Sequence, residues 1–461
     1  MNFFILLDIV LFPFCFLVCF FILRARANRC SSERVRLLYY RAFYFKVICV
    51  LAFTLITAFY FKGGDTTLYY FGIQDMRNAI SDDPNNFWTA MTSSKLTEES
   101  PLFPFFYYDN NPYDITYNYM ISTHNFTVPK VGLLPSYLFG NSYLCLNMCF
   151  GFFALGGAIR LFKAFYYFYP HLYRELAVAC LFLPGVAFWS ASLLKDPITF
   201  GCIGIIIYAL VQMIFIKKNY TASILWIIFC GYLLFTIKIY ILLVLALSLL
   251  VWFFAEFNKL IKDRTLRYIF TVMTFAGSAL VGFFLLNYLT SLEAAQEYKL
   301  DTLLSSAESQ REGYEFINQN ILQNDSHFKI NASNPVSLVL ESIVATFFRP
   351  FIWEINTPIA LLSAFESAVF LAVTLFFMFK KGVKQFFSVA FSDGRILMCF
   401  VFAFVFAFAV GSATANFGAL SRYKIPCTPF YMLLLLLLYD KVKLPLPQWF
   451  NKIINFAVPK K

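Results

Sequence analysis

Long apolar runs alternate along the chain with short clusters of basic residues. Several runs, such as residues 3–23 and 359–379, reach the roughly 20 apolar residues that a helix needs to cross a bilayer. A transmembrane β-barrel would instead show weak alternating segments. The pattern therefore predicts an all-α polytopic membrane protein with about eleven transmembrane helices, forming a single multi-span domain over residues 1–461. The predicted spans are residues 3–23, 47–61, 132–159, 175–190, 198–216, 222–236, 240–254, 268–289, 359–379, 396–410 and 427–438.

The basic clusters predict the orientation of these spans. Basic residues crowd the segment 24–46 after the first run, and further clusters follow later runs at Lys217-Lys218 and Lys380-Lys381. Cytoplasmic loops carry an excess of Lys and Arg, so we expect the N-terminus outside and the C-terminus inside. The same rule puts two larger polar loops, residues 62–130 and 291–358, on the outer side.

Composition supports a membrane protein and argues against nucleic acid as a partner. Of 461 residues, 60% are hydrophobic and 14% are charged, whereas a soluble domain carries roughly 25% charged residues. Mean hydropathy is +0.67. The net charge of +11 does not indicate nucleic-acid binding, because the basic residues lie between apolar runs, as in cytoplasmic loops. The eleven Cys lie mostly inside apolar runs and form no CxxC pair, so no structural metal site is predicted.

Asp65 is the first candidate for chemistry, because it follows the second apolar run directly after Gly63-Gly64. A carboxylate where a helix emerges into water stays charged easily and is well placed to act as a base. An ordinary helix end with a turn is the alternative. A small amphipathic helix is predicted shortly afterwards, over residues 69–80.

Other ionisable residues fall at span ends on the same predicted side. The positive-inside rule expects few cations there, so their presence suggests an anionic partner such as a lipid-linked phosphate. Arg offers a bidentate fork for phosphate and Lys a point charge. Structural alternatives stay open: a local ion pair in a hairpin, a Lys that snorkels to the interface, or an Arg–Glu pair within a loop. The candidates are Lys195, Asp196, Lys238, Arg349, Glu354, Arg422 and Lys424.

Three short motifs resemble bacterial GT-C-type membrane glycosyltransferases and membrane proteins of Bacteroidetes-type surface-polysaccharide loci. They are Gly-Gly-Asp65-x-x-x-Tyr69, Phe-Trp189-Ser-Ala-Ser-Leu-Leu-Lys195-Asp196 and Ser-Arg422-Tyr-Lys424-Ile-Pro426. In the GT-C family an early external Asp is the catalytic base, and the resemblance assigns that role to Asp65. It also implies a multi-pass location in the bacterial inner (plasma) membrane, with membrane lipid around the spans.

The expected function is sugar transfer from a polyprenyl-phosphate-linked donor to a glycan or lipid-linked acceptor, on the outer face, in cell-surface polysaccharide assembly. Arg422 and Lys424, with Lys195 or Lys238, would hold the departing phosphate. A divalent cation is left open, since the sequence offers no clear ligand set for one.

Three alternatives stay open. A repeat-unit polymerase for O-antigen, capsule or exopolysaccharide would depend more on Arg349 and Arg422 than on Asp65. A lipid-linked sugar transporter or flippase would need polar residues near the bilayer midplane, and the apolar middles of the spans count against it. A structural subunit without chemistry is the third.

Overall fold

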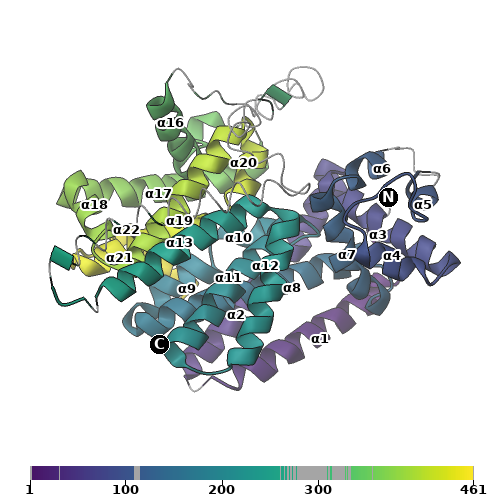
Figure 1. The fold of residues 1–461 in the computed structure, drawn as a ribbon, viewed down its shortest axis with the longest axis horizontal. Coiled ribbons are helices and arrows are strands. Elements are labelled where there is room, and N and C mark those ends of the chain that lie inside the picture. The colour runs from purple at the N-terminus through teal and green to yellow at the C-terminus, as the bar shows by residue number, and fades with distance from the viewer. Residues whose placement is uncertain are drawn as a thin grey trace. The chain divides into compact units, whose positions relative to one another are not determined.

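The computed structural model describes residues 3–30, 32–107, 115–259 and 334–459 apart from Asn356, with a few isolated residues between 261 and 330. The described residues form helices and no β-strand (Figure 1). The chain divides into two compact units: unit 1 comprises residues 1–170 and 187–238, and unit 2 comprises residues 171–186 and 239–461.

Unit 1 is built around the long helix α8. Helix α8 packs against α1, α2 and α11, and α11 packs in turn against α12. Helix α2 continues through a π-helical turn to Phe61, and α11 continues in the same way to Ile216. The bounds are α1 Asp8–Ala27, α2 Glu33–Ile56, α8 Tyr143–Phe168, α11 Lys195–Val211 and α12 Tyr220–Ile237.

Glycines bring α8 and α11 into backbone contact. A Cβ at Gly157 would lie 2.3 Å from the carbonyl oxygen of Gly201, and one at Gly204 would lie 2.1 Å from that of Gly157. Small residues allow membrane helices to approach this closely and to gain van der Waals contact without side chains between them.

The predicted first loop folds into short helices. These are α3 Asp65–Asp82, α4 Asn86–Thr92, α5 Phe103–Tyr107, α6 Ile115–Met120 and the first part of α7 Thr123–Leu138. The predicted helix over residues 69–80 is confirmed within α3, which buries Tyr69, Ile73 and Met76 on one face. Gly64 precedes α3 at φ +113°, a backbone conformation that favours glycine.

Two predicted spans are interrupted. Span 132–159 is wrong as one helix: α7 ends at Leu138, and a turn at Gly140-Asn141 leads into α8. Both turn residues have positive φ, 60° and 56°. Span 175–190 is two short helices, α9 Tyr173–Leu181 and α10 Pro184–Trp189. Pro184 has no N–H to continue α9 and disfavours the helical conformation at Leu183.

Unit 2 is centred on α19, which packs against α13, α16 and α21. The Tyr431 ring of α21 stacks on Phe347 of α16 with centroids 4.0 Å apart. Helix α16 lies inside the segment 291–358 that was predicted as a loop. The bounds are α13 Ile239–Asn258, α16 Pro335–Phe348, α17 Pro358–Lys381, α18 Val383–Ala390, α19 Gly394–Ala413, α20 Phe417–Tyr423, α21 Thr428–Lys441 and α22 Gln448–Ala457.

In the described part of the chain, eight helices are long and apolar enough to cross a membrane: α1, α2, α8, α11, α12, α13, α17 and α19. This supports a polytopic membrane protein. Among the other predicted spans, 427–438 corresponds to α21 with only 14 residues, and 268–289 lies largely outside the described residues. The number of about eleven spans and their orientation stay predictions.

The basic segment 24–46 is not a loop throughout. Helix α2 begins at Glu33, so the later basic residues of this segment lie on the helix. Lys46 is only 5% exposed. Hydrogen bonds to Ala187 O and Ser190 Oγ explain why this cation can be buried.

Candidate functional site

Lys195, Asp196 and Lys238 meet where α11 begins and α12 ends. Lys195 and Asp196 form the first turn of α11, and Lys238 is the C-cap of α12. The Lys238 ammonium donates to Asp196 Oδ1 at 2.7 Å, and the Asp196 side chain is 0% exposed. Lys238 therefore points to a buried carboxylate and joins the two helices.

His124 lies beside these lysines, at the start of α7. Burial, together with the positive charges of Lys195 and Lys238, lowers the pKa of His124 to about 3. The imidazole is therefore neutral at pH 7 and offers a hydrogen-bonding group instead of a third positive charge. Our sequence reasoning did not single out His124; the only signal was the scarcity of His, with three in the chain.

Two hydrogen bonds of neighbouring residues hold the start of α3, which carries Asp65. The Tyr69 hydroxyl, one turn after Asp65 on α3, donates to Asn125 Oδ1 at 3.1 Å, next to His124. Thr66 and the Tyr143 hydroxyl, at the start of α8, are 2.9 Å apart. Asp65 itself is half-buried as the first residue of α3, where the helix dipole favours a carboxylate. Its position fits an ordinary helix start as well as a base.

We call these residues, Asp65, His124, Lys195, Asp196 and Lys238, the helix-end cluster. They come from the beginnings of α3, α7 and α11 and the end of α12, all within unit 1. The arrangement combines two carboxylates, a neutral imidazole and two ammonium groups, and the Lys238 ammonium pairs with the Asp196 carboxylate. It can accept a proton and stabilise an anion.

The irregular backbone before Lys195 is held by buried polar side chains. Lys46 of α2 donates to Ala187 O and to Ser190 Oγ, both at 2.8 Å. Asn147 of α8 accepts from the Leu193 N–H at 2.7 Å. Buried backbone polar groups outside regular helices need partners from side chains. Lys46 and Asn147, neither of which the sequence reasoning selected, thereby position the start of α11.

In unit 2, Arg349 and Glu354 pair with each other, as the structural alternative expected. Arg349 Nε lies 3.0 and 3.1 Å from the two Glu354 oxygens, and Nη2 also donates to Oε1. The guanidinium stacks over the rings of Phe328 and Phe417, with 4.9 and 5.3 Å to their centroids. The fork of Arg349 that would bind phosphate is therefore occupied by a carboxylate.

Lys424 lies next to this pair and is 3% exposed. Its ammonium donates to Ser367 Oγ at 3.0 Å and to Arg349 O at 3.3 Å. Burial lowers the pKa of Lys424 to about 8, and the nearby Glu366 opposes that shift. Arg422 lies two residues earlier, in the last turn of α20. The structure therefore brings Arg349, Glu354 and Lys424 together, and Lys424 links the end of α20 to the backbone of Arg349.

Within the described residues, no group of three His, Cys, Asp or Glu side chains is arranged to hold a metal ion. A comparison with protein-family models, curated proteins and solved structures finds no match for this chain.

Proposed function

We propose that the protein transfers a sugar from a polyprenyl-phosphate-linked donor to a glycan or lipid-linked acceptor at the outer face of the bacterial inner membrane, in cell-surface polysaccharide assembly. The observation that carries this proposal is the helix-end cluster. It places the Asp65 carboxylate and the Lys195 and Lys238 ammonium groups at helix ends of one unit that has membrane-spanning helices.

Transfer to a hydroxyl needs a proton acceptor and positive charge for the leaving phosphate. In our mechanism the acceptor oxygen attacks C1 of the sugar while Asp65 takes the hydroxyl proton. The bond between C1 and the phosphate oxygen breaks, and the phosphate keeps the electron pair. The leaving phosphate is stabilised by Lys195 and by the N-terminal N–H groups of α11. Arg422 and Lys424 stay predicted phosphate ligands, although Lys424 already has two hydrogen-bond partners in unit 2.

Lipid-linked glycans from a strain lacking the gene test the proposal. Mass spectrometry should find an intermediate that lacks one sugar, together with loss of the mature polysaccharide. An unchanged glycan profile would contradict it. Complete single repeats that accumulate on the lipid would instead identify a repeat-unit polymerase. The occupied fork of Arg349 gives that alternative less support than the helix-end cluster gives transfer.

A lipid-linked sugar transporter is the second candidate, because polar groups do lie inside the spans. Lys46 of α2 and Glu366 of α17 are each 5% exposed, contrary to our expectation of apolar middles. The chain is also broken between α10 and α11, and broken helices line the binding sites of many transporters. In the same deletion strain this function predicts complete lipid-linked glycans that stay inaccessible to a probe added outside the membrane.

A further inference from the structure

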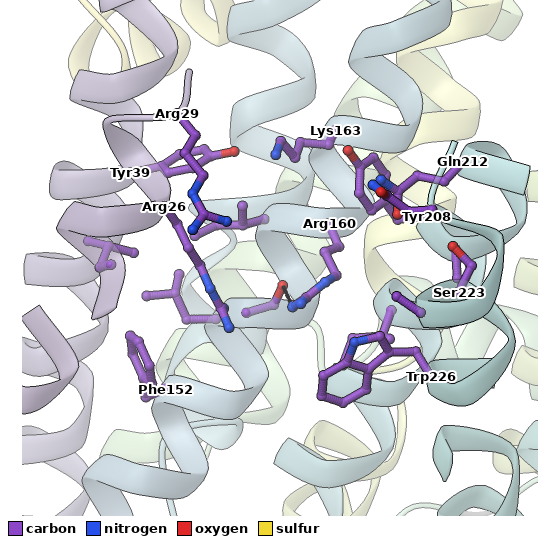
Figure 2. Close-up of a pocket in the computed structure, with 18 residues that line it drawn as sticks. Arg26, Arg29, Tyr39, Phe152, Arg160, Lys163, Tyr208, Gln212, Ser223 and Trp226 are labelled. Atoms are coloured by element: carbon purple, nitrogen blue, oxygen red, sulfur yellow. Dashed lines mark hydrogen bonds between the residues drawn. The ribbon is translucent and has the colours of Figure 1, made fainter. Parts of the chain in front are cut away.

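Unit 1 contains a second cationic site, a cavity of about 280 Å³ between α1, α2, α8, α11 and α12 (Figure 2). We call it the basic pocket. Its four basic side chains are Arg26, Arg29, Arg160 and Lys163, and none of the described residues that line it is an Asp or Glu. Among the described residues, none of these four side chains takes part in an ion pair.

Two guanidinium groups converge on one point of α8. A Cβ at Gly156 would lie 3.5 Å from Nη1 of Arg160 and 3.8 Å from Nη1 of Arg26. Arg160 donates to Gly156 O at 3.2 Å. The absent side chain at Gly156 leaves room beside both guanidinium groups. Figure 2 shows Arg26 and Arg29 opposite Arg160 and Lys163.

Aromatic rings, not carboxylates, accompany the cations. The Arg160 guanidinium lies 5.5 Å from the centroid of the Trp226 ring, and the Lys163 ammonium lies 5.4 Å from that of Tyr208. Cation–π contacts stabilise each cation by about 0.5–2 kcal/mol but leave the net positive charge in place. Like charges held this close repel one another, and a bound anion would offset that repulsion.

The basic pocket lies along the middle and second half of α8, from Phe152 to Lys163. Tyr143, at the start of α8, contacts the start of α3, whereas Gly156 and Lys163 lie roughly 13 and 20 residues further on, which is about 20 and 30 Å along a helix. The basic pocket is therefore separate from the helix-end cluster.

We propose that the basic pocket binds a phosphate group. Arg binds phosphate with a bidentate fork, and basic pockets between membrane helices suit anionic head groups. The phosphate can belong to a membrane lipid or to a water-soluble compound, since both present the same oxygens. This site is independent of sugar transfer at Asp65, so failure of either proposal leaves the other standing.

Binding is measured on the full-length protein purified in neutral detergent. One arm titrates phosphatidylglycerol, with phosphatidylcholine as the neutral comparison, and follows bound lipid by native mass spectrometry. The other arm titrates inorganic phosphate and pyrophosphate and follows the thermal shift. We expect saturable binding in at least one arm, weakened by salt, and about tenfold weaker binding in Arg160→Gln, which loses a charge-assisted hydrogen bond.

Two further variants distinguish binding in the basic pocket from non-specific electrostatic attraction. Gly156→Leu fills the space beside both guanidinium groups without removing a charge, and it should abolish binding. Arg24→Gln is the matched control, because Arg24 is exposed on α1 and does not line the pocket; its binding should equal that of the wild type. Arg26→Gln, at an exposed position of α1, replaces Arg160→Gln if that variant does not fold.

Binding of phosphatidylglycerol alone assigns the phosphate to a lipid, and binding of the soluble compounds alone assigns it to a solute. Either result supports the proposal. The proposal is overturned if neither source binds, or if Arg160→Gln and Gly156→Leu both bind as tightly as the wild type.

Discussion

The ion pair between Lys238 and Asp196 allows a direct test of the helix-end cluster. Lys238→Met removes a donor 2.7 Å from a carboxylate that is 0% exposed. Loss of one partner of a buried pair costs about 3–5 kcal/mol, because the remaining charge is left in a poor solvent. The position of Asp196 in the first turn of α11 offsets about 0.3–1 kcal/mol of this. We therefore expect a net loss of about 2–4 kcal/mol in the free energy of unfolding.

The double variant Asp196→Asn/Lys238→Met removes both charges, and it should be within about 1 kcal/mol of the wild type. The assay is reversible unfolding of the purified protein in mixed micelles, followed by circular dichroism. Lys218→Met is the matched control, since Lys218 is exposed near the other end of α12 and should change stability by no more than about 0.5 kcal/mol. The reasoning fails if Lys238→Met is no less stable than Lys218→Met.

Two further predictions concern unit 1. The pKa of His124 is about 3 in the folded protein and 6.5 in the unfolded chain, so the unfolded chain binds more protons between these two values. The free energy of unfolding therefore rises with pH across that window and is greatest above 6.5. Unfolding at a series of pH values should show this slope in the wild type and lose it in His124→Asn. Gly157→Ala places a Cβ 2.3 Å from Gly201 O and should cost about 1–3 kcal/mol in the same unfolding assay. Gly231→Ala, which meets nothing within 4 Å, should not destabilise; equal losses in the two variants would contradict close packing of α8 on α11.

The apolar runs predicted the long helices well, because a bilayer forces each span to satisfy its own backbone hydrogen bonds. The predicted spans 198–216 and 396–410, for example, lie within a few residues of α11 with its π-helical turn and of α19. The predicted spans are wrong where proline or turn-forming residues interrupt an apolar run. Pro184 splits one predicted span, and the Gly140-Asn141 turn splits another, although both signals were present in the sequence.

Long-range contacts could not be predicted in the same way. Lys46 is buried because its ammonium bonds Ser190, which is 144 residues away in the chain. A single cation at the edge of a basic segment gives no sign of such a partner. The sequence placed Lys238 and Asp196 at span ends, but their pairing depends on how α11 packs against α12.

The Arg349–Glu354 pair, by contrast, could be predicted from the sequence. The two residues are only five positions apart in the chain, so a local pair was foreseeable, and the structure confirms it. What sequence reasoning could not supply was the burial of Lys424 against the backbone of Arg349, which makes that lysine part of the packing of unit 2.

The most direct test of sugar transfer compares two carboxylates of α3. Asp65→Asn removes the proposed base at the first residue of the helix, and Asp82→Asn makes the same change at its exposed last residue. Each variant is expressed in the deletion strain at equal membrane levels, and lipid-linked glycans are analysed by mass spectrometry. We predict that Asp82→Asn restores the wild-type glycan and that Asp65→Asn accumulates the same truncated intermediate as the deletion. Wild-type glycan in the Asp65→Asn strain would contradict the role of Asp65 as the base.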